Sequence, residues 1–211
     1  AKADKVEILS EYIEDKASIF ITDNGIGMSY SDLCKNMQFP SRDMDSERDE
    51  NDLGRFGLGL KTASFSQTRT FTVISKKKYE KKYSGLTWDV EHLRTTGKWE
   101  IIVNNDNQIV EFLKRYKTIS NKHLEKFQDY QPSTIIIWEN LKNFNSYENS
   151  NNYFEHLDDE LTTKVNEYLS VVFHEFMEAD KLSFKIRLNN VLVSPFNPFI
   201  SKINETARIL E

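Results

Sequence analysis

Apolar and polar residues alternate along much of this chain in the two-residue period of β-strands. Around Glu7, for example, Val6 and Ile8 are apolar neighbours of a polar residue. The uninterrupted apolar run 135–138 is instead typical of a central strand that is buried on both faces. The segments with strand-like alternation or composition are residues 5–9, 18–22, 70–75, 82–90, 98–103, 134–138 and the hairpin 182–193.

Other segments have the three- and four-residue apolar spacing of helices. The longest stripe runs from Leu157 to Phe176, which is about five turns. Shorter helices are predicted at 29–37 and around 60–65, and one or two helices are predicted at 107–130. The segment 41–52 is almost entirely polar and is predicted to be mobile, because it cannot bury its own surface.

The composition is that of a globular chain rather than a membrane protein. The 211 residues are 38% apolar and 29% charged, and no apolar run approaches the roughly 20 residues that cross a bilayer. The single cysteine, Cys34, excludes an internal disulfide and fits a reducing, cytoplasmic compartment. We therefore expect no membrane partner, and we expect Cys34 to be a small core residue.

Charge argues against a general surface for polyanions. The net charge is −5, and the one dense basic cluster spans Lys76 to Lys82. This cluster is predicted to be the solvated tip of a hairpin, with contact to DNA as the alternative. Nucleic acid therefore stays open as a partner.

One run resembles a zinc motif without completing it. His174 begins an H-E-x-x-E sequence, in which Glu178 stands where the second ligand histidine should be. His174 flanks the apolar stripe of the long predicted helix. We therefore predict that it packs against the core, and we predict no metal site.

Glycines are concentrated in two short runs. The chain has seven glycines, and five of them lie within Asp23–Met28 or Gly54–Lys61. Glycine is favoured where the backbone needs a positive φ or must approach another group closely. The two runs therefore predict loops shaped around a ligand, with a carboxylate at one and a cation at the other.

Neither run is one of the better-known phosphate-binding loops. A P-loop places its lysine directly after the last glycine, whereas Leu60 separates Gly59 from Lys61 here. A Rossmann loop needs a third glycine, and Tyr30 or Thr62 occupies that position.

The two runs resemble the nucleotide site of the GHKL ATPases, the superfamily of DNA gyrase, MutL, the large heat-shock chaperone and the histidine kinases. The first box of that family, D-x-G-x-G, is matched by Asp23, Gly25 and Gly27. The second box, G-R-F-G-x-G-x-K in the MutL, heat-shock and MORC branches, is matched by Gly54–Lys61. The resemblance implies the Bergerat fold, an α/β (α+β) two-layer sandwich with a mixed, mostly antiparallel sheet and helices on one face.

The resemblance also implies a division of the chain. Residues 1–195 would be the ATP-binding domain, lacking the catalytic helix that precedes it in the family. Residues 196–211 would begin a linker or a transducer domain.

The resemblance further implies roles for individual residues in binding ATP. Asp23 would accept a hydrogen bond from the exocyclic amine of adenine, and Met28 would pack on the ring. Thr134 would join Asp23 there, although Ser133 replaces the glycine usual in the family. The polar segment 41–52 would form a lid. The phosphates would be held at a helix N-terminus by Gly54, Arg55, Phe56, Gly57, Leu58, Gly59, Leu60 and Lys61.

Simpler interpretations of the same residues stay open. The first box could be an asparagine–glycine turn without a ligand. Lys61 could be a solvated helix residue, and Thr134 could be a β-branched strand residue with no role in binding.

The family carries a further box, in which a glutamate activates water and an asparagine binds Mg²⁺. Residues 1–4 resemble the end of that helix, so we expect the cofactors ATP and Mg²⁺, with the asparagine ligand outside this chain. Glu11 and Glu14 are the nearest carboxylates, and neither is assigned as general base. We expect hydrolysis only in the intact protein, as an ATP-driven conformational or dimerisation switch in a homodimer. The alternative is a non-hydrolysing nucleotide-binding or interaction module.

Overall fold

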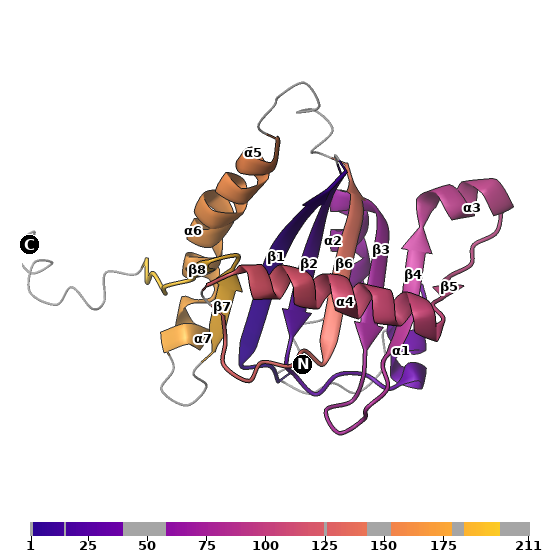
Figure 1. Cartoon of the computed structure of the whole chain (residues 1–211), viewed down its shortest axis with the longest axis horizontal. Coiled ribbons are helices and arrows are strands. Elements are labelled where there is room, and N and C mark those ends of the chain that lie inside the picture. The colour runs from indigo at the N-terminus through magenta and orange to yellow at the C-terminus, as the bar shows by residue number, and fades with distance from the viewer. Residues whose placement is uncertain are drawn as a thin grey trace, which may run out of the picture.

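The computed structural model describes residues 2–14, 16–39, 58–124, 126–142, 153–178 and 184–198, with Tyr153 and Phe154 described by their backbone alone (Figure 1). Its strands form an eight-stranded sheet in the order β5-β4-β3-β6-β2-β1-β7-β8. Neighbouring strands are antiparallel except for the parallel pair β1 and β7. The strands are β1 (Lys5–Ile13), β2 (Lys16–Asp23), β3 (Thr68–Ser75), β4 (Ser84–Asp89), β5 (Ile102–Val103), β6 (Thr134–Leu141), β7 (Lys185–Leu188) and β8 (Val191–Leu192).

Both faces of the central strands are covered, which explains their apolar composition. On β6, Ile135 and Ile137 pack with α4 (Asp106–Lys122) on one face. The residues between and after them, Ile136 and Trp138, join the clusters on the other face. Successive side chains of a strand point to opposite faces. A strand that is covered on both faces therefore carries apolar residues at consecutive positions.

Helix α4, which begins at a capping box, covers the first face. Asn105 and Gln108 form a capping box that begins α4, and the helix ends at Lys122. Ile109, Tyr116 and Ile119 of α4 are buried against the sheet. In Figure 1 this helix crosses in front of the strands.

The remaining long helices lie on the second face. α1 (Tyr30–Met37) begins at a capping box formed by Ser29 and Asp32. The helical run near the C-terminus contains one π-helical turn, η2 (Leu161–Val165). The other helices on the second face are α2 (Gly59–Gln67), α5 (Tyr153–Glu160), α6 (Asn166–Val172) and α7 (His174–Glu178). A further helix, α3 (Val90–Thr96), follows β4.

The predicted α+β sandwich with its mixed, mostly antiparallel sheet is confirmed. Helices were predicted on one face only, whereas the structure has them on both, with α4 covering the first face. The predicted hairpin is confirmed for β7 and β8, with its turn at Asn189 and Asn190, whereas α3 was not predicted. The proposed lid at 41–52 lies outside the described residues. Among the described residues, no helix is long and apolar enough to cross a membrane.

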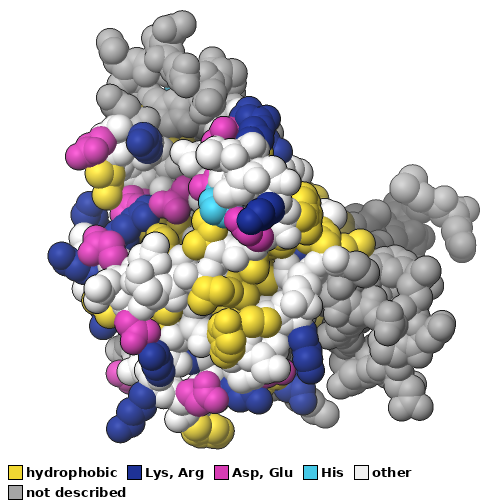
Figure 2. Space-filling view, turned by 90° about the vertical axis from the view of Figure 1, so that its right-hand side faces the viewer, with side chains coloured by type: hydrophobic (Ala, Val, Ile, Leu, Met, Phe, Trp, Pro, Cys, Tyr) yellow, Lys and Arg dark blue, Asp and Glu magenta, His cyan; other side chains and the backbone are white. Residues whose placement is uncertain are grey.

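The edge of the sheet at β5 exposes apolar side chains. Trp99 is 68% exposed and Val103 is 57% exposed. Figure 2 views the molecule from this side, and apolar side chains gather in the middle of that view. Nothing in the described chain covers these residues from outside.

Candidate nucleotide site

Three polar residues stand side by side where three neighbouring strands end. Asp23 closes β2 and lies opposite Thr134, the first residue of β6. Thr134 in turn lies opposite Ser75, the last residue of β3. Residues directly opposite in antiparallel strands project to the same face. We call Asp23, Thr134 and Ser75 the polar row.

The polar row lies on the face that carries α1 and α2. In β2, Ile19 and Ile21 share the face of Asp23 and pack in the second-face clusters. In β3, Phe71 and Val73 share the face of Ser75 and pack near α1. The sheet therefore presents a carboxylate and two hydroxyls beneath those helices.

The loop after Asp23 is a tight turn supported by the aspartate itself. Asp23 Oδ1 accepts a hydrogen bond from the Gly25 N–H at 2.8 Å. The carbonyl of Asp23 accepts from the Ser133 N–H, also at 2.8 Å. The turn of the simpler interpretation is thus present, and the carboxylate still has a second oxygen for a ligand.

Gly27 is the position where glycine is indispensable. Its φ is +64°, and a Cβ built there would lie 1.8 Å from the carbonyl oxygen of Lys76. Both the left-handed backbone and the close approach exclude a side chain. The first box therefore presses its backbone against the end of β3.

Burial makes the Asp23 carboxylate harder to ionise. Desolvation raises the pKa of Asp23 above its ordinary value, while hydrogen bonds from Gly25 and Ser133 oppose the shift. A donor on a bound ligand would favour the ionised form in the same way. The hydrogen bonds that the Asp23 carboxylate receives in this structure therefore do not fully offset the cost of burying its negative charge.

Met28 links the polar row to α1. Its backbone N–H donates to Ser75 Oγ at 2.9 Å. Its sulfur accepts from the side-chain amide of Asn36 on α1, at 3.6 Å. Met28 is half-buried beside the apolar cluster that contains Leu33 and Met37.

The second box is described from Leu58 onward. Gly54, Arg55, Phe56 and Gly57 lie outside the described residues, so their part in binding stays a prediction. Gly59, Leu60 and Lys61 form the first turn of α2, and Leu58 supplies no side-chain cap. The N–H groups of this turn are therefore not satisfied by a capping side chain.

Lys61 is buried, so its interpretation as a solvated helix residue is wrong. The side chain is fully buried, and Nζ donates to the carbonyl of Asn36 at 2.7 Å. Nζ also lies 5.0 Å from the centre of the Phe39 ring. Desolvation lowers the pKa of Lys61. Asn36 thus contacts Met28 of the first box and Lys61 of the second.

The predicted hairpin tip closes the same end of the sheet. Residues 77–82 are exposed between β3 and β4, as predicted. The hydroxyl of Tyr83 donates to the carbonyl of Pro132 at 2.5 Å, and burial raises the pKa of Tyr83 to about 12.

A cavity of about 250 Å³ opens beside the first box. Its lining includes Asn24 and Gly25 but none of the polar row, and it consists of Asn24, Gly25, Lys76, Lys78, Asp129, Gln131, Pro132 and Ser133. Asp129 in this lining would oppose an anion that the two lysines attract. The cavity is therefore separate from the face on which Asp23 meets Thr134.

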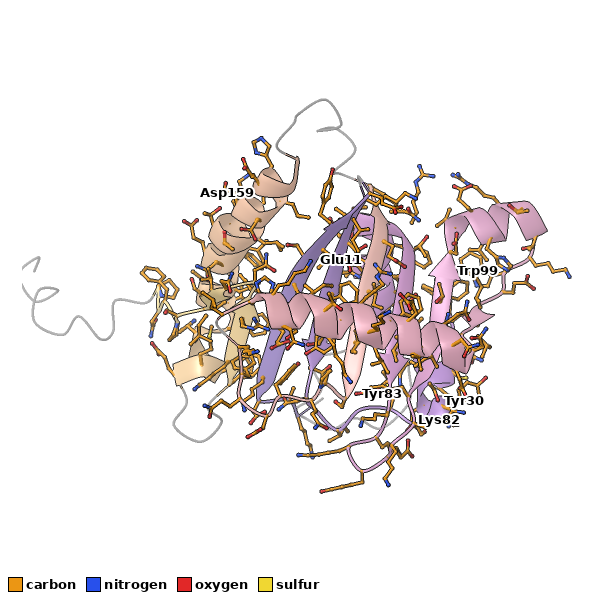
Figure 3. The ribbon with its side chains drawn as sticks, in the orientation of Figure 1. Glu11, Tyr30, Lys82, Tyr83, Trp99 and Asp159 are labelled. Carbon is orange, nitrogen blue, oxygen red and sulfur yellow. The ribbon has the colours of Figure 1, made fainter. Side chains whose placement is uncertain are left out.

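Glu11, one of the two carboxylates considered as a general base, has a structural partner. Glu11 accepts from Arg115 of α4 at 2.5 Å and is 7% exposed (Figure 3). It lies on the α4 face, away from the polar row, because it packs toward that helix. No general base is assigned to Glu11, as the sequence also indicated.

Sequence reasoning missed Ser75 and Asn36. Ser75 ends a strand far from both boxes, and only its register with Thr134 brings it to the site. Asn36 follows an ordinary helical pattern, and no sequence signal distinguishes it.

Comparison with known proteins agrees with this arrangement. The family model described as "Histidine kinase-, DNA gyrase B-, and HSP90-like ATPase" matches residues 1–130. The chain belongs to this family. The GHKL resemblance and the ATP-binding function that it implied are therefore confirmed at the level of the family. The matched residues include both boxes and end before Thr134.

Curated relatives of this ATPase domain carry the name chaperone protein HtpG. The protein of Rickettsia prowazekii is 31% identical over 134 residues, which are 56% of this chain and 20% of the relative. That of Wigglesworthia glossinidia brevipalpis is 27% identical over 115 residues, 49% of this chain and 17% of the relative. That of Buchnera aphidicola is 34% identical over 86 residues, which are 36% of this chain and 14% of the relative. The chain thus matches only about a fifth, or less, of these relatives.

Proposed function

We propose that this domain binds ATP with its adenine against the polar row and its phosphates at the N-terminus of α2. Asp23 accepts from the exocyclic amine of adenine, Thr134 completes that contact, and Met28 packs on the ring. Gly25 and Gly27 let the backbone pass close to the base. The residues from Gly54 to Lys61 hold the phosphates.

The observation that carries this proposal is the contact through Asn36. Its side chain donates to Met28 of the first box, and its carbonyl accepts from Lys61 of the second. Met28 of the first run and Lys61 of the second, which are distant in sequence, therefore meet at one residue of α1. A base-binding carboxylate and a phosphate-binding cation need that proximity to hold one nucleotide.

The residues present fit a nucleotide. The uncapped N–H groups of the first turn of α2 and the Lys61 ammonium suit phosphate oxygens. Lys61 would exchange its hydrogen bond to Asn36 for one to a phosphate. The exchange costs little, because the first acceptor is a neutral carbonyl and the second is charged.

Mg²⁺ accompanies ATP in this family generally. Within the described ranges, no group of three or more His, Cys, Asp and Glu side chains could hold a metal. Mg²⁺ usually keeps several waters and takes only one or two protein carboxylates beside substrate phosphates. We therefore assign it no residue of this chain; when bound, it would neutralise phosphate charge.

Hydrolysis and switching are proposed for the longer protein of which this domain would be a part. They would use a general base and a magnesium ligand other than the residues assigned here.

An ATP-dependent homodimer is the proposed assembly, and a non-hydrolysing binding module is the second candidate. Light scattering with and without ATP tests the dimer, and phosphate release tests hydrolysis. The cytoplasmic location stays a prediction.

Titration calorimetry with ATP and GTP tests the binding site. We expect ATP to bind more tightly than GTP, because guanine has a carbonyl oxygen at the position where the amine of adenine would donate a hydrogen bond to Asp23. Asp23→Asn should weaken ATP binding at least tenfold, which corresponds to about 1.4 kcal/mol. The matched control is Asp106→Asn, since Asp106 is an exposed partner of Lys82 remote from the row. Unchanged ATP affinity in Asp23→Asn would disprove the assignment.

A further inference from the structure

Lys61 occupies a position that no phosphate can reach. The residue is 0% exposed, and its Nζ donates to the carbonyl of Asn36 at 2.7 Å. Nζ also lies over the Phe39 ring, 5.0 Å from its centre. A ligand cannot contact an ammonium that the protein covers on all sides. The lysine must therefore leave this position before it can bind a phosphate.

The two contacts of Lys61 differ in what can replace them. A phosphate oxygen accepts a charge-assisted hydrogen bond, so it can take the place of the Asn36 carbonyl. An aromatic face attracts an ammonium through its quadrupole, most strongly where water is excluded, and a phosphate offers no such face. The contact with Phe39 is therefore lost when Lys61 turns to a phosphate, and this loss opposes binding.

Other aromatic side chains hold the Phe39 ring in place. Its centre lies 5.8 Å from that of Trp88 and 6.0 Å from that of Trp99, both in edge-to-face arrangements. The indole N–H of Trp88 donates to the carbonyl of Met37 at 3.0 Å, which fixes the chain two residues before Phe39. The cluster thus keeps the ring where the ammonium of Lys61 meets its face.

We propose that Phe39 is a positioning residue for Lys61. It stabilises the lysine in a buried position without phosphate and thereby lowers the affinity of the domain for ATP. ATP gains its contact with Lys61 only in molecules in which the lysine has left the ring, so the apparent affinity falls with the fraction of such molecules. This inference rests on the proposed ATP site. It gives a residue outside both glycine boxes a role in setting the affinity.

The test compares ATP with adenosine, which has the same base and ribose but no phosphate. Phe39→Leu removes the ring and keeps an apolar side chain. We expect calorimetric titration to show ATP affinity about fivefold higher, which corresponds to about 1 kcal/mol, and adenosine affinity unchanged. The ratio of the two affinities should therefore increase. A purely structural role would change both affinities by the same factor and leave that ratio unchanged.

Lys61→Met decides whether the effect passes through the lysine. In a chain that already carries Lys61→Met, adding Phe39→Leu should not change the ratio, because no ammonium remains to contact the ring. A ratio that still increases in this background overturns the proposal.

Phe65→Leu is the matched control. Phe65 belongs to the same aromatic cluster, and its ring centre lies 6.1 Å from that of Phe39. We expect this variant to lower the melting temperature and to change the ratio by no more than about twofold. Phe39→Tyr keeps a ring face for the ammonium, so it should retain the ratio of the original chain.

Phe39→Met serves if Phe39→Leu does not fold, because methionine fills irregular spaces in a core without a ring. An unchanged ratio in a folded variant that lacks the ring overturns the proposal, while ATP binding that depends on Asp23 leaves the proposed function intact. If the unmodified chain binds ATP no better than Asp23→Asn does, the proposed function itself fails, and this inference fails with it.

Discussion

At the scale of single residues, Gly27 is constrained in two ways that a matched glycine can separate. Gly27 and Gly97 have nearly the same backbone, with φ of +64° and +66°. Only at Gly27 would a Cβ meet another atom, the Lys76 carbonyl oxygen, whereas Gly97 has open space. A substitution by alanine would therefore incur the cost of the left-handed backbone at both positions. Only at Gly27 would it add a steric clash.

We expect Gly97→Ala to lower the free energy of unfolding by about 1–2 kcal/mol, the cost of a left-handed backbone for alanine. Gly27→Ala should cost more than this and should also weaken ATP binding, because the first box must move away from β3. Thermal melting and calorimetric titration measure the two effects. Equal losses of stability in the two variants would mean that the close approach at Gly27 is unimportant.

Asp23 should make folding stability depend on pH in a particular direction. Burial raises its pKa, so the folded chain holds this proton more tightly than the unfolded chain does. The carboxyl therefore loses stability for the fold as pH rises from its unfolded value of about 3.9 through the raised value. Above that window the full penalty remains.

Asp23→Asn should consequently raise the melting temperature at pH 7 while weakening ATP binding. The gain should disappear as the pH falls below about 3.9, where the unfolded carboxyl is protonated as well. Melting curves between pH 3 and 8 measure this difference. A variant that is less stable than the original chain at pH 7 would contradict the assigned direction.

At the scale of elements, α4 is attached to the sheet by charge as well as by apolar packing. Arg115 pairs with Glu11 of β1 and with Glu139 of β6, at 2.5 and 2.7 Å. Its guanidinium also lies 5.3 Å from the centre of the Phe20 ring. One guanidinium thus pairs with two carboxylates on the strands beneath the helix.

Arg115→Met should destabilise the fold by about 3 kcal/mol, because it leaves both carboxylates without their partner. Lys114→Met is the control, since Lys114 is exposed on the same helix and should change stability by no more than about 0.5 kcal/mol. Urea unfolding of both variants measures the difference. Similar midpoints would show that the ion pairs contribute nothing.

At the scale of the whole molecule, a buried ion pair joins the first strand to the last hairpin. Glu7 of β1 and Arg187 of β7 lie 2.6 Å apart, and both are 1% exposed. The hydroxyl of Tyr116 on α4 donates to the same glutamate at 2.8 Å. We propose that β7 and β8 belong to the nucleotide-binding domain predicted for residues 1–195, because the sheet is continuous and this pair joins β7 to β1.

Unfolding should therefore be a single transition. The three tryptophans lie outside β7 and β8: Trp88 is on β4, Trp138 is on β6, and Trp99 lies between α3 and β5. Arg187→Met should shift tryptophan fluorescence and far-ultraviolet circular dichroism to lower urea together, by about 3–5 kcal/mol. Lys185→Met, at an exposed position of the same strand, should shift neither. An early transition seen by circular dichroism alone would show that the hairpin unfolds separately.

The sequence by itself determined the features that depend on neighbouring residues. Glycines and apolar periods act over a few bonds, so they indicated a possible turn after Asp23, a helix at 29–37 and a hairpin within 182–193. Each of the two boxes is a short run of residue types at fixed spacing, so the boxes predicted the ATPase family without any knowledge of the tertiary structure.

Only the tertiary structure decided which distant residues meet. The side of the sheet that α4 covers, the burial of Lys61 against Asn36 and the place of Ser75 in the polar row all depend on register and packing. A serine at the end of a strand is locally the same residue whichever strand lies beside it. The pairing of β3 with β6 makes Ser75 part of a site, because that pairing sets its hydroxyl beside Thr134.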